Sequence, residues 1–269
     1  MTFSKKTAVV TGASSGIGAV YADRLAARGF DLVLVARRGD RLEALARTLA
    51  EKHGVSVRSL VADLEKEADV ARVEEVLASD DNVQMLVNNA GVARLSTLAE
   101  TAVDVSVSQV ALNVIALTRL THAVLPAFLA RNQGTIINIA SVLSVHSWEI
   151  SSVYSGTKSY VLAFSRGIQD ELAKARSNVK LQVVLPASTA TEIWSESVSG
   201  IPLSALGQDT IMSAEDCVDA ALAGLDQGEI ITFPSVEDGN LWSEYDSVRG
   251  ALFAATQTGT PASRYRLSR

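Results

Sequence analysis

The sequence has little of what several classes of protein require. Its single cysteine, Cys217, excludes an internal disulfide bond, and the amphipathic stretch around it favours a buried thiol. The three histidines and this cysteine show no metal-binding spacing, so we expect no metal site. No basic run and no interleaving of basic and aromatic residues is present, and the formal net charge is -6. These absences argue against nucleic acid or an anionic membrane as the main partner.

Long apolar runs are also missing. No stretch approaches the roughly 18 apolar residues of a membrane-spanning helix, and Met1–Lys6 lacks the apolar core of a signal peptide. We therefore expect a cytoplasmic protein with no membrane partner. Hydrophobic residues nevertheless make up 48% of the 269 residues, which is enough for one large core. We expect a single dinucleotide-binding catalytic domain over residues 1–269.

Short β-rich runs alternate with helical patterns along the chain, which is typical of βαβ units. The pattern predicts an α/β protein, a Rossmann fold with a doubly wound, seven-stranded parallel sheet flanked by helices. The predicted strands are Thr7–Thr11, Asp31–Ala36, Val55–Val61, Met85–Asn88, Thr135–Ala140, Lys180–Leu185 and Ile230–Phe233. The predicted helices are Ile17–Ala27, Asp40–His53, Ala68–Ser79, Val103–Arg131, Ser152–Ala175 and Ala214–Leu225. Two segments break the alternation, and we expect a substrate-binding loop at 191–213 and a C-terminal extension at 236–269.

A glycine-rich turn over Val9–Gly18 joins the first strand to the first helix. Glycines there let the backbone turn sharply, approach a pyrophosphate and pack the helix against the sheet. The Thr-Gly-x-x-x-Gly-x-Gly spacing is not the commonest dinucleotide fingerprint, and an ordinary turn is the alternative. Its place between strand and helix favours a dinucleotide. The expected contacts are Gly12, Ser14, Ser15, Gly16, Ile17 and Gly18.

Basic residues follow the second strand, where a fold that prefers NAD usually has an acid for the ribose diol. Arg37, Arg38 and Arg41 gather at the start of the next helix, whose positive dipole end normally favours acids. An anion among them would explain the cluster, and the 2′-phosphate of NADP(H) fits. The alternative is a solvated surface cluster partly balanced by Asp40. We expect NADP(H) to be preferred over NAD(H), with Arg37 and Arg38 binding it.

Polar residues also follow the third and fourth strands. Asp63, next to Leu64, could face the adenine or cap the following helix. Asn89, Ala90 and Gly91 form a turn suited to hydrogen bonds with a cofactor. Because the carboxyl ends of parallel strands share one edge of the sheet, these residues predict a ligand site at that edge.

The chemistry is clearest at Ser141 and at Tyr154 with Lys158. Tyrosine and lysine at i and i+4 share a helical face, so the ammonium should favour the ionised phenol and lower its pKa. Ser141 follows the fifth strand and can donate to a substrate carbonyl. Asn113 is a polar residue in an apolar helical context, where a buried amide needs partners.

Together these motifs resemble the short-chain dehydrogenase/reductase family from Lys6 to about Phe233, and the arginines resemble its NADPH-preferring members. The resemblance implies that Tyr154 donates the proton in reduction and that Ser141 orients the carbonyl. It also implies that Lys158 binds the nicotinamide ribose and lowers the tyrosine pKa, and that Asn113 holds a proton-relay water. Members of this family form homodimers or homotetramers, so we expect one here.

The sequence departs from the family at Ala187, which follows Pro186 where glycine is usual. Thr189 and Thr191 keep the expected spacing, so we expect cofactor binding to survive with an altered loop path.

The predicted activity is NADPH-dependent carbonyl reduction, equally secondary-alcohol oxidation, on a ketone or 3-oxo substrate. A 3-oxoacyl thioester reductase is the alternative within the enzyme class, and a catalytically silent NADP(H)-binding sensor or scaffold is the alternative outside it. Candidates for the substrate pocket are His146, Trp148 and Trp194, each of which could instead be a packing or interface residue. His122 is expected on a helix surface or in the core.

Overall fold

The structure is a computed structural model that describes residues 6–265. They fall into two compact units, divided between Ser235 and Val236. The prediction that Met1–Lys6 is not a targeting segment concerns residues that, apart from Lys6, lie outside the range that the structure describes. The role of residues 236–269 as an extension of the catalytic domain stays a prediction.

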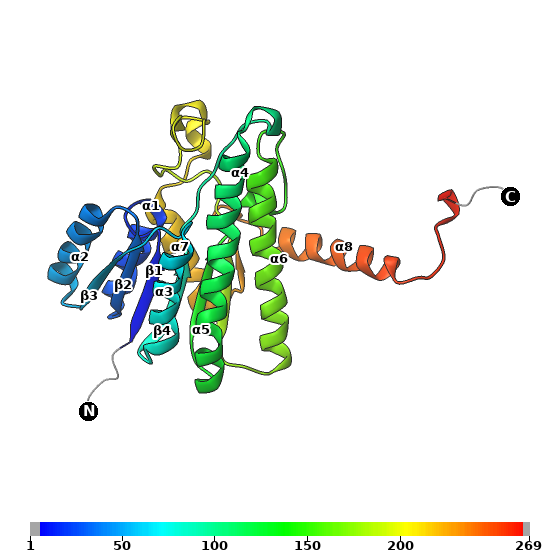
Figure 1. Ribbon diagram of the computed structural model, residues 1–269. Coiled ribbons are helices and arrows are strands. Elements are labelled where there is room, and N and C mark those ends of the chain that lie inside the picture. The colour runs from blue at the N-terminus through cyan, green and yellow to red at the C-terminus, as the bar shows by residue number, and fades with distance from the viewer. Residues whose placement is uncertain (1–5, 266–269) are drawn as a thin grey trace. The chain divides into compact units, whose positions relative to one another are not determined.

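A seven-stranded parallel sheet forms the centre of the larger unit, which confirms the predicted fold class (Figure 1). The strand order is β3-β2-β1-β4-β5-β6-β7, so the order reverses between β1 and β4. Ligands of open α/β sheets bind beyond the carboxyl ends of the strands at such a reversal. The strands are β1 Thr7–Thr11, β2 Asp31–Ala36, β3 Val57–Val61, β4 Val83–Asn88, β5 Thr135–Ile139, β6 Lys180–Val184 and β7 Ile231–Thr232.

Helices cover both faces of this sheet, since every crossover between parallel strands must pass over one face. On one face α1 contacts α2 and α7, and on the other α3 contacts α5 while α6 contacts α4. The helices of the larger unit are α1 Gly16–Ala27, α2 Gly39–His53, α3 Glu67–Ser79, α4 Val103–Val110, α5 Leu117–Arg131, α6 Ser152–Lys174 and α7 Ala214–Gln227. The short helical turns are η1 Leu98–Glu100, η3 Val142–Ser144, η4 Leu203–Ala205 and η5 Gln208–Thr210. The smaller unit contains α8 Asn240–Thr256 and η6 Ser263–Tyr265.

The central strands are buried on both faces, which explains why they read as nearly continuous apolar runs. Every residue of β1 is buried, whereas the edge strand β3 is only partly covered. Tyr21 and Leu25 of α1 pack in the same core as Val10 and Leu34 of the sheet. The core therefore fixes α1 against the strands whose ends form the candidate site.

A chain of buried polar side chains crosses the middle of the sheet. The Asn88 amide donates to Thr121 Oγ1 at 3.0 Å and to Asn138 Oδ1 at 2.9 Å. The Asn138 amide in turn donates to Ser165 Oγ at 2.9 Å. These bonds link β4 and β5 to α5 and α6, so they tie both helices to the sheet.

The predicted helix Val103–Arg131 is continuous but contains the π-helical segment η2 Ala111–Ala116 in its middle. It is long and apolar enough to cross a membrane by length and composition. The expectation that no segment approaches that limit is wrong here, because scattered polar residues interrupt the apolar run without removing its overall apolarity. Much of this helix faces protein, with 44% of its most apolar window buried and α5 packed on α3, β4 and β5.

Candidate active site

The glycine-rich turn has the geometry of a phosphate cradle. Gly12 and Gly16 have φ of +66° and +54°, a region that other residues rarely adopt. A Cβ on Gly18 would collide with the backbone oxygen of Gly12, so this glycine lets α1 approach the turn. Helix α1 begins at Gly16 with no acid in its first turn, and its positive end faces the cavity that Gly12 and Gly16 line. The turn therefore fits the pyrophosphate of a dinucleotide.

Thr11 and Asn89 hold the turn against the end of β4. The Thr11 hydroxyl donates to Val87 O at 3.2 Å and accepts from the backbone N–H groups of Asn89 and Ala90, both at 3.0 Å. The Asn89 amide donates to Thr11 O at 3.0 Å and to Gly12 O at 3.3 Å. This explains the Thr-Gly and Asn-Asn-Ala-Gly motifs as two halves of one hydrogen-bonded junction.

The arginine cluster has acidic partners other than the one considered from the sequence. Arg38 donates to the hydroxyls of Ser14 and Ser15, at 3.0 and 2.7 Å, and to Glu192 at 2.5 Å. Arg41 donates to the other carboxylate oxygen of Glu192 at 2.5 Å. Arg37 pairs with Glu65 at 3.4 Å. The partner of Arg38 and Arg41 thus comes from the loop after β6, not from Asp40.

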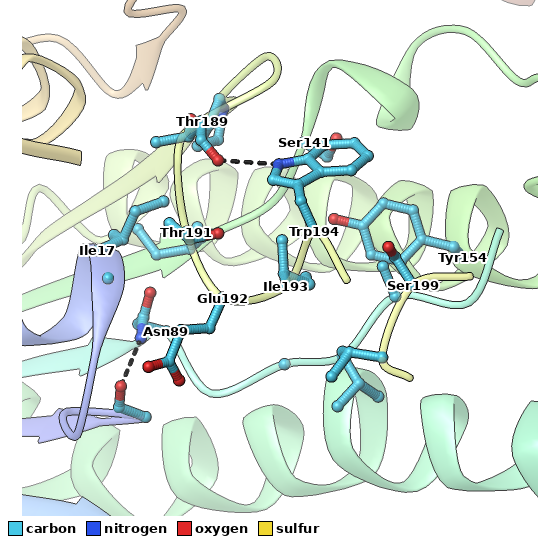
Figure 2. A pocket seen from close by; sticks show the side chains of 18 of the residues that line it. Ile17, Asn89, Ser141, Tyr154, Thr189, Thr191, Glu192, Ile193, Trp194 and Ser199 are labelled. Atoms are coloured by element: carbon cyan, nitrogen blue, oxygen red, sulfur yellow. Dashed lines mark hydrogen bonds between the residues drawn. The ribbon is translucent and has the colours of Figure 1, made fainter. Parts of the chain in front are cut away.

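A cavity of about 760 Å³ is lined by Arg37 and Arg38 and by Tyr154. Figure 2 shows Tyr154 with other residues that line it. Most of the residues predicted to bind cofactor or to act in catalysis line it. They are Gly12, Ser14, Ser15, Gly16, Ile17, Arg37, Arg38, Leu64, Asn89, Ala90, Gly91, Ser141, Tyr154, Lys158, Pro186, Ala187, Thr189 and Thr191. Three other predicted residues, Gly18, Asp63 and Asn113, do not line it.

Asp63 and Asn113 make local contacts instead. The Asp63 carboxylate accepts a hydrogen bond from Glu65 N at 3.3 Å, in the turn after β3. The N-cap residue of α3 is Lys66. Asp63 therefore does not cap α3, and its predicted contact with the adenine stays a prediction. The Asn113 side chain is buried and pairs with both backbone polar groups of Val92, at 2.8 and 2.9 Å. It anchors the segment after Gly91, and its predicted water contact stays a prediction.

The proposed catalytic side chains come from β5 and α6. Ser141 follows β5 and lines the same cavity as Tyr154. Tyr154 lies in the first turn of α6, and Lys158 lies one turn later with Nζ 5.8 Å from the tyrosine ring centroid. Lys158 Nζ donates to Ile139 O at 2.9 Å, at the end of β5. The structure therefore brings together the serine, tyrosine and lysine that the sequence separates.

The predicted lowering of the tyrosine pKa is not found in this structure. The surrounding protein withdraws the phenol from bulk water and raises the pKa of Tyr154 to about 12, which the neighbouring Ser141 hydroxyl only partly opposes. Burial also lowers the pKa of Lys158 to about 8. The sequence spacing predicts the proximity of the two side chains correctly, but desolvation of the phenol is the larger influence on its pKa.

Ala187 fits its loop without backbone strain. Among residues 6–265, the non-glycine residues with positive φ are Asn132 and Arg176, so Ala187 has a conformation that alanine adopts readily. Pro186 O accepts from Val142 N at 3.0 Å, which joins this loop to the segment after Ser141. Ala187 therefore does not require the altered path of the loop after β6 that the sequence predicts.

The part of the cavity beyond Tyr154 is mostly apolar. Trp194 lies beside Ser141 and Tyr154, and its indole N–H donates to Thr189 O at 2.9 Å (Figure 2). Trp148 also lines the cavity, whereas His146 does not, and both His122 and His146 are exposed. The buried thiol of Cys217, with its pKa raised by burial to about 11, lies in α7 as expected.

Several lining residues escaped the sequence analysis. Apolar residues in loops show no helical or strand periodicity that would predict their burial. A single acidic residue in a polar loop is normally expected to face solvent. They include Leu95, Leu143, Glu192, Ile193, Val198 and Leu206.

Known proteins similar to this chain share both its fold and its motifs. A short-chain dehydrogenase from Sphingobium yanoikuyae in complex with NADPH is 41% identical, with a TM-score of 0.92, and the match covers 97% of this chain and 100% of that one. A bulky-bulky ketone specific alcohol dehydrogenase from Comamonas testosteroni is 35% identical, with a TM-score of 0.89 and coverage of 98% and 100%.

More distant curated relatives include human 17-beta-hydroxysteroid dehydrogenase type 3, 35% identical over 68% of this chain and 59% of the relative. Very-long-chain 3-oxoacyl-CoA reductase-B of Danio rerio is 33% identical over 70% and 61%. The match thus spans about three fifths of the length of these two relatives. The family model for short chain dehydrogenase matches residues 6–201. The chain belongs to the short-chain dehydrogenase family of oxidoreductases.

Proposed function

We propose that this protein is an NADPH-dependent reductase of ketones with large apolar substituents, which also oxidises the corresponding secondary alcohols. The observation that carries the proposal is that Ser141, Tyr154 and Lys158 line one largely apolar cavity, with Lys158 Nζ 5.8 Å from the Tyr154 ring centroid. The cofactor and substrate classes agree with the NADPH complex and the bulky-ketone enzyme among the similar structures.

In this proposal the chain's residues position a carbonyl and supply its proton. The reduced nicotinamide supplies a hydride when bound, and its oxidised form adds a positive charge to the site. Ser141 donates a hydrogen bond to the carbonyl oxygen, and Tyr154 donates the proton that completes the alcohol. The high pKa of Tyr154 keeps the phenol protonated and ready to donate at neutral pH. Lys158 holds an ammonium near the phenol, which favours its return to the phenolate in the reverse direction.

The charges around the cavity favour a free ketone over a coenzyme A thioester. Within the described chain, the basic residues that line the cavity are Arg37 and Arg38 at the far end and Lys158 beside the phenol. The wall formed by Trp148, Trp194 and their apolar neighbours offers no cationic group for the phosphates of a thioester carrier. The 3-oxoacyl thioester reductase remains the second candidate because relatives with that name match the chain.

A substrate screen with each cofactor tests the proposal. The purified chain is assayed with NADPH and with NADH against small ketones, diaryl and alkyl-aryl ketones, 3-oxoesters and 3-oxoacyl thioesters. We expect the highest kcat/KM for NADPH with the diaryl or alkyl-aryl ketones. A higher kcat/KM for the thioesters would identify the second candidate. Binding of NADPH with no turnover of any ketone or alcohol would instead identify a sensor or scaffold.

The variant Tyr154→Phe is the control for chemistry within that screen. Loss of the proton donor should lower kcat by at least about a hundredfold, while the affinity for NADPH and the melting temperature stay close to those of the wild type. Activity near that of the wild type would remove Tyr154 from the mechanism.

A further inference from the structure

The carboxylate of Glu192 occupies an anion position inside the cofactor cavity. One oxygen accepts from Arg38 and the other from Arg41, each at 2.5 Å. The remaining nitrogens of Arg38 contact Ser14 and Ser15 of the glycine-rich turn. Glu192 thereby connects the loop after β6 to the turn and to the start of α2.

This contact lies at a ligand site and contributes little to folding. The side chains of Arg38, Arg41 and Glu192 are 42, 54 and 53% exposed, and ion pairs with that exposure stabilise proteins weakly. Hydrogen bonds from Arg38 and Arg41 lower the pKa of Glu192, so the carboxylate is charged at neutral pH. Glu192 and Arg38 also line the cavity that runs to Tyr154.

We propose that Glu192 is a specificity-determining residue of the cofactor site, where its carboxylate holds the place at Arg38 that the 2′-phosphate of NADP(H) takes. The inference rests on the proposed use of NADPH. A phosphate and a carboxylate at one position would repel each other, so binding of the phosphate releases Glu192 from the arginines. A dinucleotide without the 2′-phosphate leaves both ion pairs in place.

The replacement of Glu192 by the 2′-phosphate links the identity of the cofactor to the part of the cavity that contains Trp194 and Tyr154. Glu192 is two residues before Trp194, whose indole N–H bonds to Thr189 O and whose ring lies beside Tyr154 (Figure 2). Release of Glu192 therefore frees this loop from the adenosine end of the cavity. An adenine nucleotide that carries the 2′-phosphate changes the loop, whereas an adenine nucleotide without it does not.

Binding of two cofactor fragments tests the competition directly. Calorimetry measures the affinity of the wild type, Glu192→Gln and Glu196→Gln for 2′,5′-ADP and for 5′-ADP. The control Glu196→Gln removes the same charge from the same loop, at a residue whose backbone oxygen accepts from Arg94. We expect Glu192→Gln to bind 2′,5′-ADP about three- to tenfold more tightly, because two exposed ion pairs no longer compete. Its affinity for 5′-ADP, and both affinities of the control, should change less than about twofold.

Two results overturn the proposal. The first is that Glu192→Gln and Glu196→Gln bind 2′,5′-ADP with equal affinity. This result overturns the proposal even if the wild type binds 2′,5′-ADP and 5′-ADP equally. The other is a gain for Glu192→Gln that is the same with both fragments, because that shows a general effect of charge. Neither measurement requires turnover, so a failure of the proposed ketone reduction is recognised separately in the substrate screen.

Hydrogen exchange tests the link to the loop. In the wild type we expect amides of residues 191–199 to exchange faster with saturating 2′,5′-ADP than with saturating 5′-ADP. In Glu192→Gln this difference between the fragments should disappear. Equal exchange with both fragments in the wild type would contradict the release of Glu192.

Discussion

Lys158 is a buried ammonium, with 5% of the residue exposed, and it is retained at a cost in stability. Burial lowers its pKa from 10.5 to about 8, a difference that corresponds to roughly 3 kcal/mol of destabilisation at pH 7. Between those pH values the unfolded chain binds more protons than the folded one, so this cost fades as the pH rises. The cost is fully present below the folded pKa of about 8.

The variant Lys158→Met should therefore unfold at a higher urea concentration than the wild type at pH 7, while losing activity. We expect its advantage in the free energy of unfolding, about 1 to 3 kcal/mol at pH 7, to shrink as the pH rises from 8 to 10. Lys174→Met, at an exposed position of the same helix, is the matched control and should change little. A less stable Lys158→Met at pH 7 would mean that the ammonium and its bond to Ile139 O stabilise the fold.

Arg37 and Arg38 carry the prediction on cofactor preference. Contacts of both guanidinium groups with a 2′-phosphate should give a preference for NADPH over NADH of about a hundredfold or more. The double variant Arg37→Ala/Arg38→Ala should lose most of it, measured as the ratio of kcat/KM values.

The salt dependence of the preference for NADPH distinguishes binding of the 2′-phosphate by the arginines from a purely structural effect of the substitutions. Exposed ion contacts are screened, so the wild-type preference should decrease as the salt concentration rises while the affinity for NADH changes little. Equal efficiency with both cofactors in the wild type, or an unchanged preference in the double variant, would show that the arginines are a solvated surface cluster.

At the scale of the elements, the sequence predicted all seven strands because each is a short apolar run between turn residues. Their ends differ from the predictions by no more than two residues, since the last residue of a strand is set by pairing with its neighbour and not by its own side chain. The π-helical segment η2 was not predicted, because a single extra residue in a helical turn barely changes the apolar period.

The candidate site was predictable where one short motif carries several contacts. The Tyr154–Lys158 spacing and the glycine-rich turn are of this kind. Long-range partners were not predictable from local patterns, and the Arg38–Glu192 pair joins residues 154 positions apart. Burial was equally hidden, and in the chain without cofactor it raises the pKa of Tyr154, which the sequence predicts to be lowered.

The polar chain through Asn138 gives a prediction at this scale. Asn138→Ala leaves the Ser165 hydroxyl and an Asn88 donor with fewer partners, so it should lower the free energy of unfolding by about 1 to 3 kcal/mol. Ser165→Ala removes the Ser165 hydroxyl. The double variant Asn138→Ala/Ser165→Ala should therefore lose less free energy of unfolding than the sum of the losses in the two single variants. Strictly additive losses in urea titrations would show that the two side chains act independently.

At the scale of the whole molecule, exposed apolar residues on α4 and η2 suit the predicted homo-oligomer. Val103, Val107 and Ile115 are 72, 58 and 52% exposed, and neighbouring apolar side chains at helical spacing normally need a partner. Light scattering at micromolar concentration should give the mass of a dimer or tetramer.

Charged substitutions locate that interface. Val107→Glu/Ile115→Glu should lower the mass toward that of a monomer, whereas Ile230→Glu, at a 55% exposed position of the same unit, should not. A monomer mass for the wild type, or no change in the double variant, would contradict an interface on these helices.

The order of the strands also determines when each half of the site becomes complete during synthesis. β1, β2, β3 and β4 are neighbours in the sheet and all lie before residue 89, so the chain that leaves the ribosome first contains the glycine-rich turn and the arginines. Ser141, Tyr154 and Lys158 follow more than 50 residues later. The nascent chain thus contains β1 to β4 and the glycine-rich turn before it contains Tyr154, the proposed proton donor.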